Sequence, residues 1–145
     1  MVNINVGEDN FHLDERLQSS TFFLIDWPLS RVLLKNNAFY PWFVLVPRTS
    51  NLTELTQLSQ GARYQLMDEV QQVSLVVQDI FKPSKLNVGT LGNIVHQFHM
   101  HVVARFFDDP LWPEGIWQSA TPEKAYEEPE ILISRLIDKL SEVAF

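Results

Sequence analysis

The sequence contains no cysteine, and this absence removes several kinds of chemistry at once. Without thiols the chain can form no disulfide, has no thiolate nucleophile and cannot hold zinc through sulfur. Long apolar runs are also missing, because none approaches the roughly 20 residues that span a bilayer. Residues 1–10 are polar and acidic and lack the basic and apolar regions of a signal peptide. We therefore expect a cytoplasmic protein with no membrane partner.

Positive charge is scarce as well. Lysine and arginine number 11 against 18 acidic residues, which gives a formal net charge of −7. A general nucleic-acid binder needs a basic surface to neutralise phosphates, so a nucleic acid polymer is not an expected partner. A small anionic ligand stays compatible with this charge, because a few cations are enough for one positive pocket. The length of 145 residues, with 46% hydrophobic and 20% charged residues, predicts a single globular domain over residues 1–145.

Three apolar runs in the first third of the chain predict strands. They cover residues 21–26, 31–35 and 42–46 and are rich in aromatic and branched side chains. The pair Asn36-Asn37 lies between the second and third runs, and paired asparagines favour a turn. We therefore expect these two strands to form a hairpin.

A helical pattern follows over residues 53–81, with a break expected near residues 59–61. Pro83 prevents the helix from continuing. Six apolar residues at spacings of one, three or four form one stripe on this long helix: Leu66, Met67, Val70, Val73, Val77 and Ile80.

The remaining elements complete an α+β pattern. Residues 13–18 predict a short first helix, and residues 86–91 and 97–107 predict two more strands. The final helix should start near Pro129, because proline suits the first turn of a helix. A hairpin, a long helix and further strands describe an α+β domain with an antiparallel sheet.

The last predicted strand concentrates the histidines of the chain. Side chains alternate between the two faces of a strand, so Gln97, His99 and His101 should share one face. His96 should lie on the opposite, mostly apolar face, which excludes it from a site built by the other two. A neutral imidazole can attack phosphorus, and a second imidazole two residues away can donate to a phosphoryl oxygen. A His-x-His pair on a strand also suits a metal.

The string from Asn87 to Arg105, Asn-Val-Gly-Thr-Leu-Gly-Asn-Ile-Val-His-Gln-Phe-His-Met-His-Val-Val-Ala-Arg, resembles the signature of the histidine-triad (HIT) superfamily. That signature alternates histidines with hydrophobic residues and ends in two hydrophobic residues. Residues 43–48, Phe-Val-Leu-Val-Pro-Arg, resemble the second motif strand of the family. The resemblance covers residues 11–107 and leaves residues 108–145 as a Trp- and Pro-containing loop and a C-terminal helix. It implies a HIT-like fold, with an antiparallel sheet of about five strands, one long helix and a C-terminal helix.

The resemblance also implies roles for individual residues. His99 matches the histidine that attacks the α-phosphate and becomes nucleotidylated, and His101 matches the last histidine, which contacts phosphate oxygens. Gln97 takes the first position of the catalytic set, where most members have histidine. The implied substrate-binding residues are Asn36 or Asn37 for the ribose hydroxyls, Asn87 at the border of phosphate and ribose, and Gly92-Asn93 at the phosphate pocket.

The implied function is that of a nucleotide hydrolase or nucleotidyl transferase, with a phosphoramidate or dinucleoside polyphosphate as substrate and no metal or other cofactor. Two alternatives stay open. Gln97 cannot exchange a proton as histidine does, which fits a non-catalytic nucleotide-binding module. A metal-dependent hydrolase would use His99 and His101, with His12, His96 or a distant carboxylate as a third ligand.

The sequence departs from the family at two further places. The pattern Gln-x-His-x-His followed by residues 111–117, Leu-Trp-Pro-Glu-Gly-Ile-Trp, resembles a bacterial branch of the superfamily. Trp42 stands where several branches carry an additional histidine, so its ring either stacks on a base or forms the core or pocket wall. Members commonly pair through the long helix and a strand, which implies a homodimer.

Overall fold

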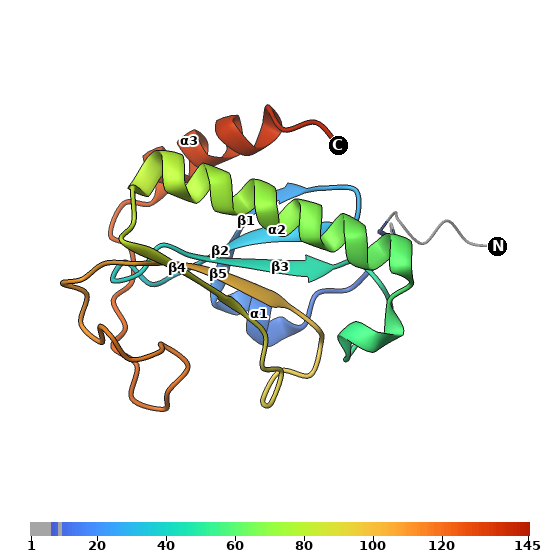
Figure 1. The fold of residues 1–145 in the computed structure, drawn as a ribbon, viewed down its shortest axis with the longest axis horizontal. Coiled ribbons are helices and arrows are strands. Elements are labelled where there is room, and N and C mark those ends of the chain that lie inside the picture. The colour runs from blue at the N-terminus through green and yellow to red at the C-terminus, as the bar shows by residue number, and fades with distance from the viewer. Residues whose placement is uncertain (1–6, 9) are drawn as a thin grey trace.

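Five strands form one antiparallel sheet in the computed structural model, which describes residues 7, 8 and 10–145. The strand order is β1-β2-β3-β5-β4, so the predicted α+β class and strand number are confirmed. Most of residues 1–10, on which the signal-peptide argument rests, lie outside the described part. The elements in chain order are α1 (Glu15–Ser19), β1 (Thr21–Asp26), β2 (Ser30–Lys35), β3 (Trp42–Pro47), the 3-10 helix η1 (Leu55–Gln57), α2 (Gln60–Phe81), β4 (Lys85–Gly89), β5 (Met100–Arg105) and α3 (Glu130–Ser141) (Figure 1).

The first three strands follow the predicted pattern. β1 covers the expected residues, and β2 and β3 pair in antiparallel register with Leu34 opposite Phe43. The Asn-rich segment between them makes the expected connection, with the Asn37 N–H donating to the Lys35 carbonyl at 2.8 Å. All six residues of β3 are buried, because this strand lies in the middle of the sheet.

Helix α2 begins where the sequence predicted a break. The Ser59 side chain accepts a hydrogen bond from the Ala62 N–H at 3.1 Å and caps the helix, while the residues before it form the separate η1 turn. The left-handed backbone of Lys82, with φ 49°, ends the helix just before Pro83. Met67 is 46% exposed and does not belong to the buried stripe, because it lies about 100° around the helix from Leu66.

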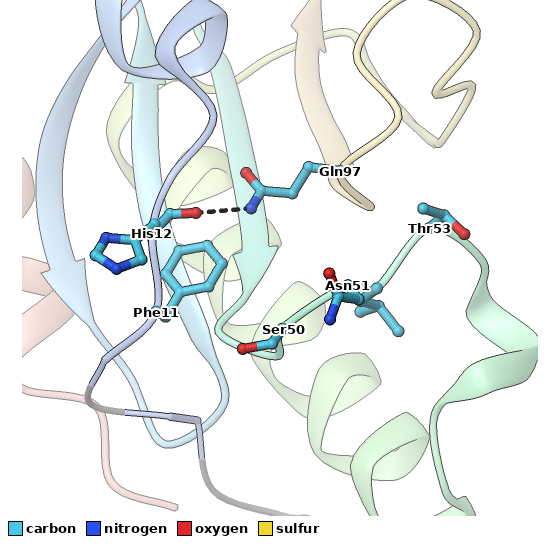
Figure 2. A pocket seen from close by; sticks show the side chains of 7 residues that line it. Phe11, His12, Ser50, Asn51, Thr53 and Gln97 are labelled. Carbon is cyan, nitrogen blue, oxygen red and sulfur yellow. Dashed lines mark hydrogen bonds between the residues drawn. The ribbon is translucent and has the colours of Figure 1, made fainter.

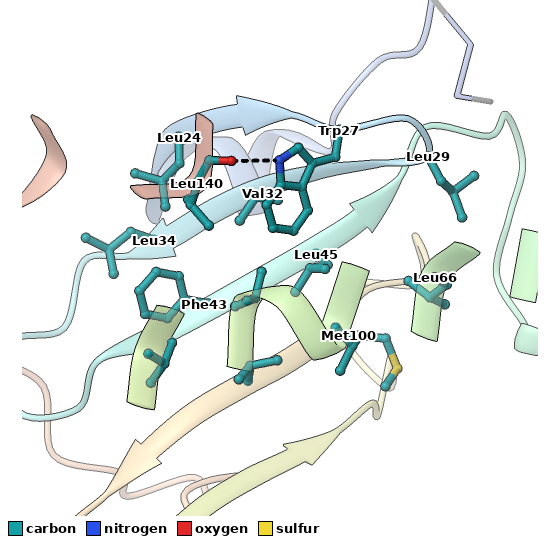
Figure 3. Packing of buried hydrophobic residues seen from close by; sticks show 14 of the residues in the cluster. Leu24, Trp27, Leu29, Val32, Leu34, Phe43, Leu45, Leu66, Met100 and Leu140 are labelled. Carbon is teal, nitrogen blue, oxygen red and sulfur yellow. Dashed lines mark hydrogen bonds between the residues drawn. The ribbon is translucent and has the colours of Figure 1, made fainter. Parts of the chain in front are cut away.

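Each face of the sheet carries its own hydrophobic cluster. Helices α2 and α3 pack over one face (Figure 1), where the Trp27 indole N–H donates to the Leu140 carbonyl at 3.3 Å (Figure 3). The other face packs against the N-terminal segment around Phe11 and α1 and against the loop that carries Ile116. The side chains of Trp42, Val44 and Val103 belong to this second face, where a cavity lies beside the apolar cluster.

The predicted strand over residues 97–107 is wrong at its start, because β5 begins only at Met100. Residues 90–99 form a loop whose turn uses the positive φ of 72° at Gly92, a conformation that glycine adopts without strain. The strand ends at Arg105, whose guanidinium is buried and bonded to Asp109 through two contacts of 2.7 and 3.0 Å.

α3 begins directly after Pro129, as predicted. No helix among the described residues has the length and apolar character needed to cross a membrane.

Candidate active site

A cavity of about 510 Å³ opens beside His99 and His101, on the sheet face opposite α2. Four segments far apart in the sequence build it: the end of β2, the start of β3, the loop and strand around the histidines, and the chain after Ile116. Its lining consists of Lys35, Trp42, Leu91, Gly92, Asn93, Ile94, Val95, His99, His101, Ile116, Trp117, Gln118, Ser119, Thr121 and Glu123. We call this space the histidine cavity.

The hydrogen bond of His99 fixes its ring chemistry. The Nδ1 atom lies 2.7 Å from the backbone carbonyl oxygen of Gln97. A carbonyl only accepts, so Nδ1 carries the proton and Nε2 of the neutral ring keeps its lone pair. Burial lowers the pKa of His99 below its ordinary value of 6.5, and the nearby Lys35 charge acts in the same direction. The bond to Gln97 opposes this shift only in part, so His99 stays neutral near pH 7.

His101 has the opposite tautomer. Its Nδ1 accepts a hydrogen bond of 2.9 Å from the indole N–H of Trp42, which can only donate. The proton of the neutral ring therefore lies on Nε2. Burial lowers the pKa of His101 to about 3, with smaller effects of His99 and Lys35 in the same direction. The centroids of the two imidazole rings lie 4.8 Å apart in an edge-on arrangement.

The two tautomers complement each other chemically. One neutral imidazole has an unshared lone pair, and its neighbour has an N–H group that can donate to an oxygen anion. A lone pair and a donor within one half-enclosed cavity suit attack on a phosphorus atom whose oxygens need stabilisation. Trp42, whose role the sequence left between base stacking and the core, forms part of the wall and sets the tautomer of His101.

Gln97 does not share this cavity, although strand alternation predicted a common face with His99 and His101. The chain at Gln97 is not yet in β5, and the side chain turns toward the N-terminal segment. Its Nε2 donates to the His12 carbonyl at 2.9 Å (Figure 2). Its Oε1 accepts from the Asp14 N–H at 2.8 Å. Gln97 and His12 border a separate hollow of about 350 Å³ near Asn51, which shares no lining residue with the histidine cavity. Gln97 interacts with His99 through its backbone carbonyl, which accepts the hydrogen bond from His99 Nδ1.

The asparagines expected at the ribose lie outside the cavity lining. Asn36 accepts from the Tyr126 N–H at 2.9 Å, and Asn37 donates to the Pro122 carbonyl at 3.1 Å. Both therefore hold the C-terminal segment against the β2–β3 connection. Asn87 accepts from the buried Arg105 guanidinium at 2.9 Å and is likewise engaged elsewhere.

Gly92 and Asn93, to which the resemblance assigned a phosphate-binding role, both line the histidine cavity. His96 is exposed, bonds the Gly92 carbonyl through Nδ1 at 3.0 Å and does not line that cavity. Lys35 and Glu123 are lining residues that the sequence did not single out. Lys35 is the last residue of β2, and Glu123 lies in the chain after Ile116.

The arrangement gives little support to a metal centre. Among residues 7, 8 and 10–145, no group of three or more histidine or acidic side chains is placed to hold a metal ion. His12 and His96, the proposed third ligands, are exposed and lie outside the histidine cavity.

Comparison with known proteins identifies the fold and the family. A sequence model of the HIT domain matches residues 16–108. A histidine triad protein from Bradyrhizobium japonicum is 38% identical, with a TM-score of 0.84, over 89% of this chain and 97% of that one. A histidine triad protein from Marinobacter aquaeolei is 34% identical, with a TM-score of 0.86, over 92% of this chain and 98% of that one. A histidine triad protein from Sinorhizobium meliloti is 31% identical, also with a TM-score of 0.86, over 92% of this chain and 99% of that one.

No curated protein matches the chain significantly. The matched residues, 16–108, make up more than half of the chain and include His99 and His101 near their end. The chain therefore belongs to the HIT domain family of histidine triad proteins.

Proposed function

We propose that the protein is a nucleotide hydrolase or nucleotidyl transferase that acts at the α-phosphate of a phosphoramidate or dinucleoside polyphosphate. The observation that carries the proposal is the Nδ1 contact of His99 with the Gln97 carbonyl, which leaves Nε2 as a nucleophile. Family membership supports nucleotide chemistry in general. A cavity of about 510 Å³ also falls in the size range of small-molecule sites.

In the first step, Nε2 of His99 attacks the α-phosphorus and the bond from phosphorus to the leaving group breaks. The leaving group takes its proton from solvent or keeps one of its own. The imidazole becomes positively charged as the N–P bond forms, and the Gln97 carbonyl stabilises that charge through the Nδ1 proton. The Nε2–H of His101 donates to a phosphoryl oxygen, together with groups of Gly92 and Asn93 at the cavity edge.

In the second step, water or another acceptor attacks the same phosphorus and breaks the bond to His99. The acceptor loses a proton to solvent, and the neutral His99 with its Nδ1 proton is regenerated. Neither step uses a protein-bound metal ion. The side chain of Gln97, held by the N-terminal segment, stabilises the loop that carries the accepting carbonyl.

The test is turnover of adenosine and guanosine phosphoramidates and dinucleoside polyphosphates by two histidine variants. His99→Ala removes the nucleophile and should lower kcat at least about a thousandfold. His96→Ala is the matched control, because this exposed ring lies outside the histidine cavity. It should keep activity within about twofold of the natural protein, as surface substitutions usually do. Undiminished turnover by His99→Ala would refute the proposal.

A non-catalytic nucleotide binder is the second candidate, since Gln97 stands at the position of the first histidine and its side chain is bonded to the N-terminal segment instead. Such a protein would bind a nucleoside monophosphate in the same cavity and show no turnover with any member of the substrate panel.

We also propose a homodimer formed through α2 and the edge strand β4. β4 lies at one end of the sheet, and Val88 on it is 46% exposed. Tyr64, Met67 and Leu75 of α2 are exposed as well, so both elements present apolar side chains at the surface. Sedimentation at micromolar concentration should give twice the chain mass, and a monomer would refute the dimer.

The cytoplasmic location stays a prediction that cell fractionation can test.

A further inference from the structure

Lys35 brings a positive charge into the histidine cavity. It is the last residue of β2, and among the described residues that line the cavity it is the only lysine or arginine. Its Nζ atom lies 4.9 Å from the centroid of the Trp42 ring, over the same indole whose N–H bonds His101. The ammonium group is therefore held beside the catalytic histidines through a defined contact.

Lys35 has no close carboxylate partner in the described part of the chain. Within residues 7, 8 and 10–145, none of the ion pairs within 4.0 Å involves Lys35. Glu123 lines the same cavity and acts on Lys35 only at longer range. Burial lowers the pKa of Lys35, and Glu123 opposes this shift. A half-buried ammonium without a close anionic partner costs free energy, which a bound anion would offset.

We propose that Lys35 is a substrate-binding residue that contacts the phosphate groups of the ligand and makes the cavity select phosphorylated nucleosides over nucleosides. The inference rests on the proposed function for the identity of the ligand as a nucleotide. An ammonium group has three donors on a flexible stem, so it can follow phosphate oxygens as the charge moves between them. The negative charge of Glu123 in the same cavity opposes the binding of an anion.

Lys35 has a second effect on the same chemistry. Its positive charge disfavours the protonated forms of His99 and His101, while Asp14 favours that of His99. Removal of Lys35 should therefore raise the pKa of both histidines. A purely structural lysine distant from the site would leave both titrations unchanged.

The experiment measures binding of AMP and adenosine by isothermal titration calorimetry, with four variants beside the natural protein. Lys35→Met should weaken AMP binding about tenfold or more, as expected for loss of a charge-assisted hydrogen bond, and leave adenosine binding unchanged. Lys35→Arg should retain most of the AMP affinity, and Glu123→Gln should increase it. Lys85→Met is the matched control, because Lys85 is exposed and opposite Arg105, at the far end of β4 from Gly89 and His101.

Histidine titration by NMR provides a readout that does not require turnover. In Lys35→Met, the pKa of His99 should move upward relative to the natural protein, and in Lys85→Met it should not move. Thermal unfolding of each variant shows whether the fold is kept.

The possible results separate the two proposals. If the natural protein binds AMP and Lys35→Met binds it equally well, the role of Lys35 is refuted and the proposed function stands. Equal loss of AMP and adenosine binding in Lys35→Met would show a structural role and would also refute the proposal for Lys35. If the natural protein binds neither ligand, both proposals fail.

Discussion

At the scale of single residues, the hydrogen bond from Trp42 to His101 decides what the second histidine can do. An imidazole that accepts at Nδ1 presents an N–H at Nε2, and that group can donate to a phosphate oxygen. The other tautomer would present a lone pair and repel the same oxygen. The indole thus acts as a positioning residue, because its N–H orients His101.

Replacement of Trp42 by phenylalanine tests this role. The variant keeps an aromatic wall but loses the indole N–H, so His101 can adopt the unproductive tautomer. We expect kcat to fall about 10- to 100-fold with little change in KM, because the lost interaction acts in the transition state.

Trp27→Phe is the matched control for that experiment. It also removes one buried indole hydrogen bond, to the Leu140 carbonyl, but on the opposite face of the sheet. It should lower stability by about 1 kcal/mol and leave kcat unchanged. Equal kcat values for the two tryptophan variants would contradict the role of Trp42.

The sequence predicted some of these residues and missed others for physical reasons. His99 and His101 could be paired because residues two apart share a strand face, and that spacing survives at the start of β5. Gln97 was misplaced because the strand begins three residues later than its apolar pattern indicates. Lys35 was missed because a lysine at a strand end looks like an ordinary surface charge until the chain after Ile116 closes over it.

At the scale of elements, a buried carboxylate joins helix α2 to the sheet. Glu69 is fully buried and accepts hydrogen bonds from the Leu29 and Ser30 N–H groups at 2.8 and 3.0 Å. These two donors lie at the start of β2, where β1 and β2 are connected. The contact fixes the beginning of the strand that ends at Lys35 in the histidine cavity.

Glu69→Gln should destabilise the fold. One carboxylate oxygen becomes an amide NH2 group that faces a backbone donor, so a buried N–H loses its acceptor, and we expect the free energy of unfolding to fall by about 1–3 kcal/mol. Burial raises the pKa of Glu69, so its carboxyl contributes most below the ordinary value of 4.5 and less as the pH rises through the raised pKa.

Urea unfolding at several pH values measures both effects. The pH dependence due to Glu69 should disappear in Glu69→Gln. Asp68→Asn, an exposed change in the same turn of α2, should alter stability by less than about 0.5 kcal/mol. If the two variants were equally stable, the proposed anchoring by Glu69 would be wrong.

Elements were easier to predict than their ends. β1, the β2–β3 hairpin and α2 have strong periodic patterns and clear stop signals such as Pro83. The loop over residues 90–99 contains apolar residues at strand-like positions, yet Ile94 is 80% exposed. The local pattern could not show that Ile94 would lie exposed while Phe98 packs into the core on the helix-covered face.

At the scale of the whole molecule, the histidine cavity depends on segments that are far apart in the sequence and that the fold brings together. β2 supplies Lys35, β5 supplies His101, and the chain after Ile116 covers both. The two expected ribose asparagines, Asn36 and Asn37, instead hold residues 122–126 in place, so they contribute to the closure of the cavity. No sequence spacing indicates such contacts between distant segments.

The most direct test of the central claim is to trap the nucleotidyl-histidine. The natural protein is mixed with an adenosine phosphoramidate, quenched within one turnover under non-acidic conditions and analysed by mass spectrometry of its peptides. We predict an added AMP group on the peptide that contains His99, present in the natural protein and in His96→Ala and absent in His99→Ala. Turnover of the phosphoramidate with no adduct on His99, or with the adduct on another residue, would contradict the account.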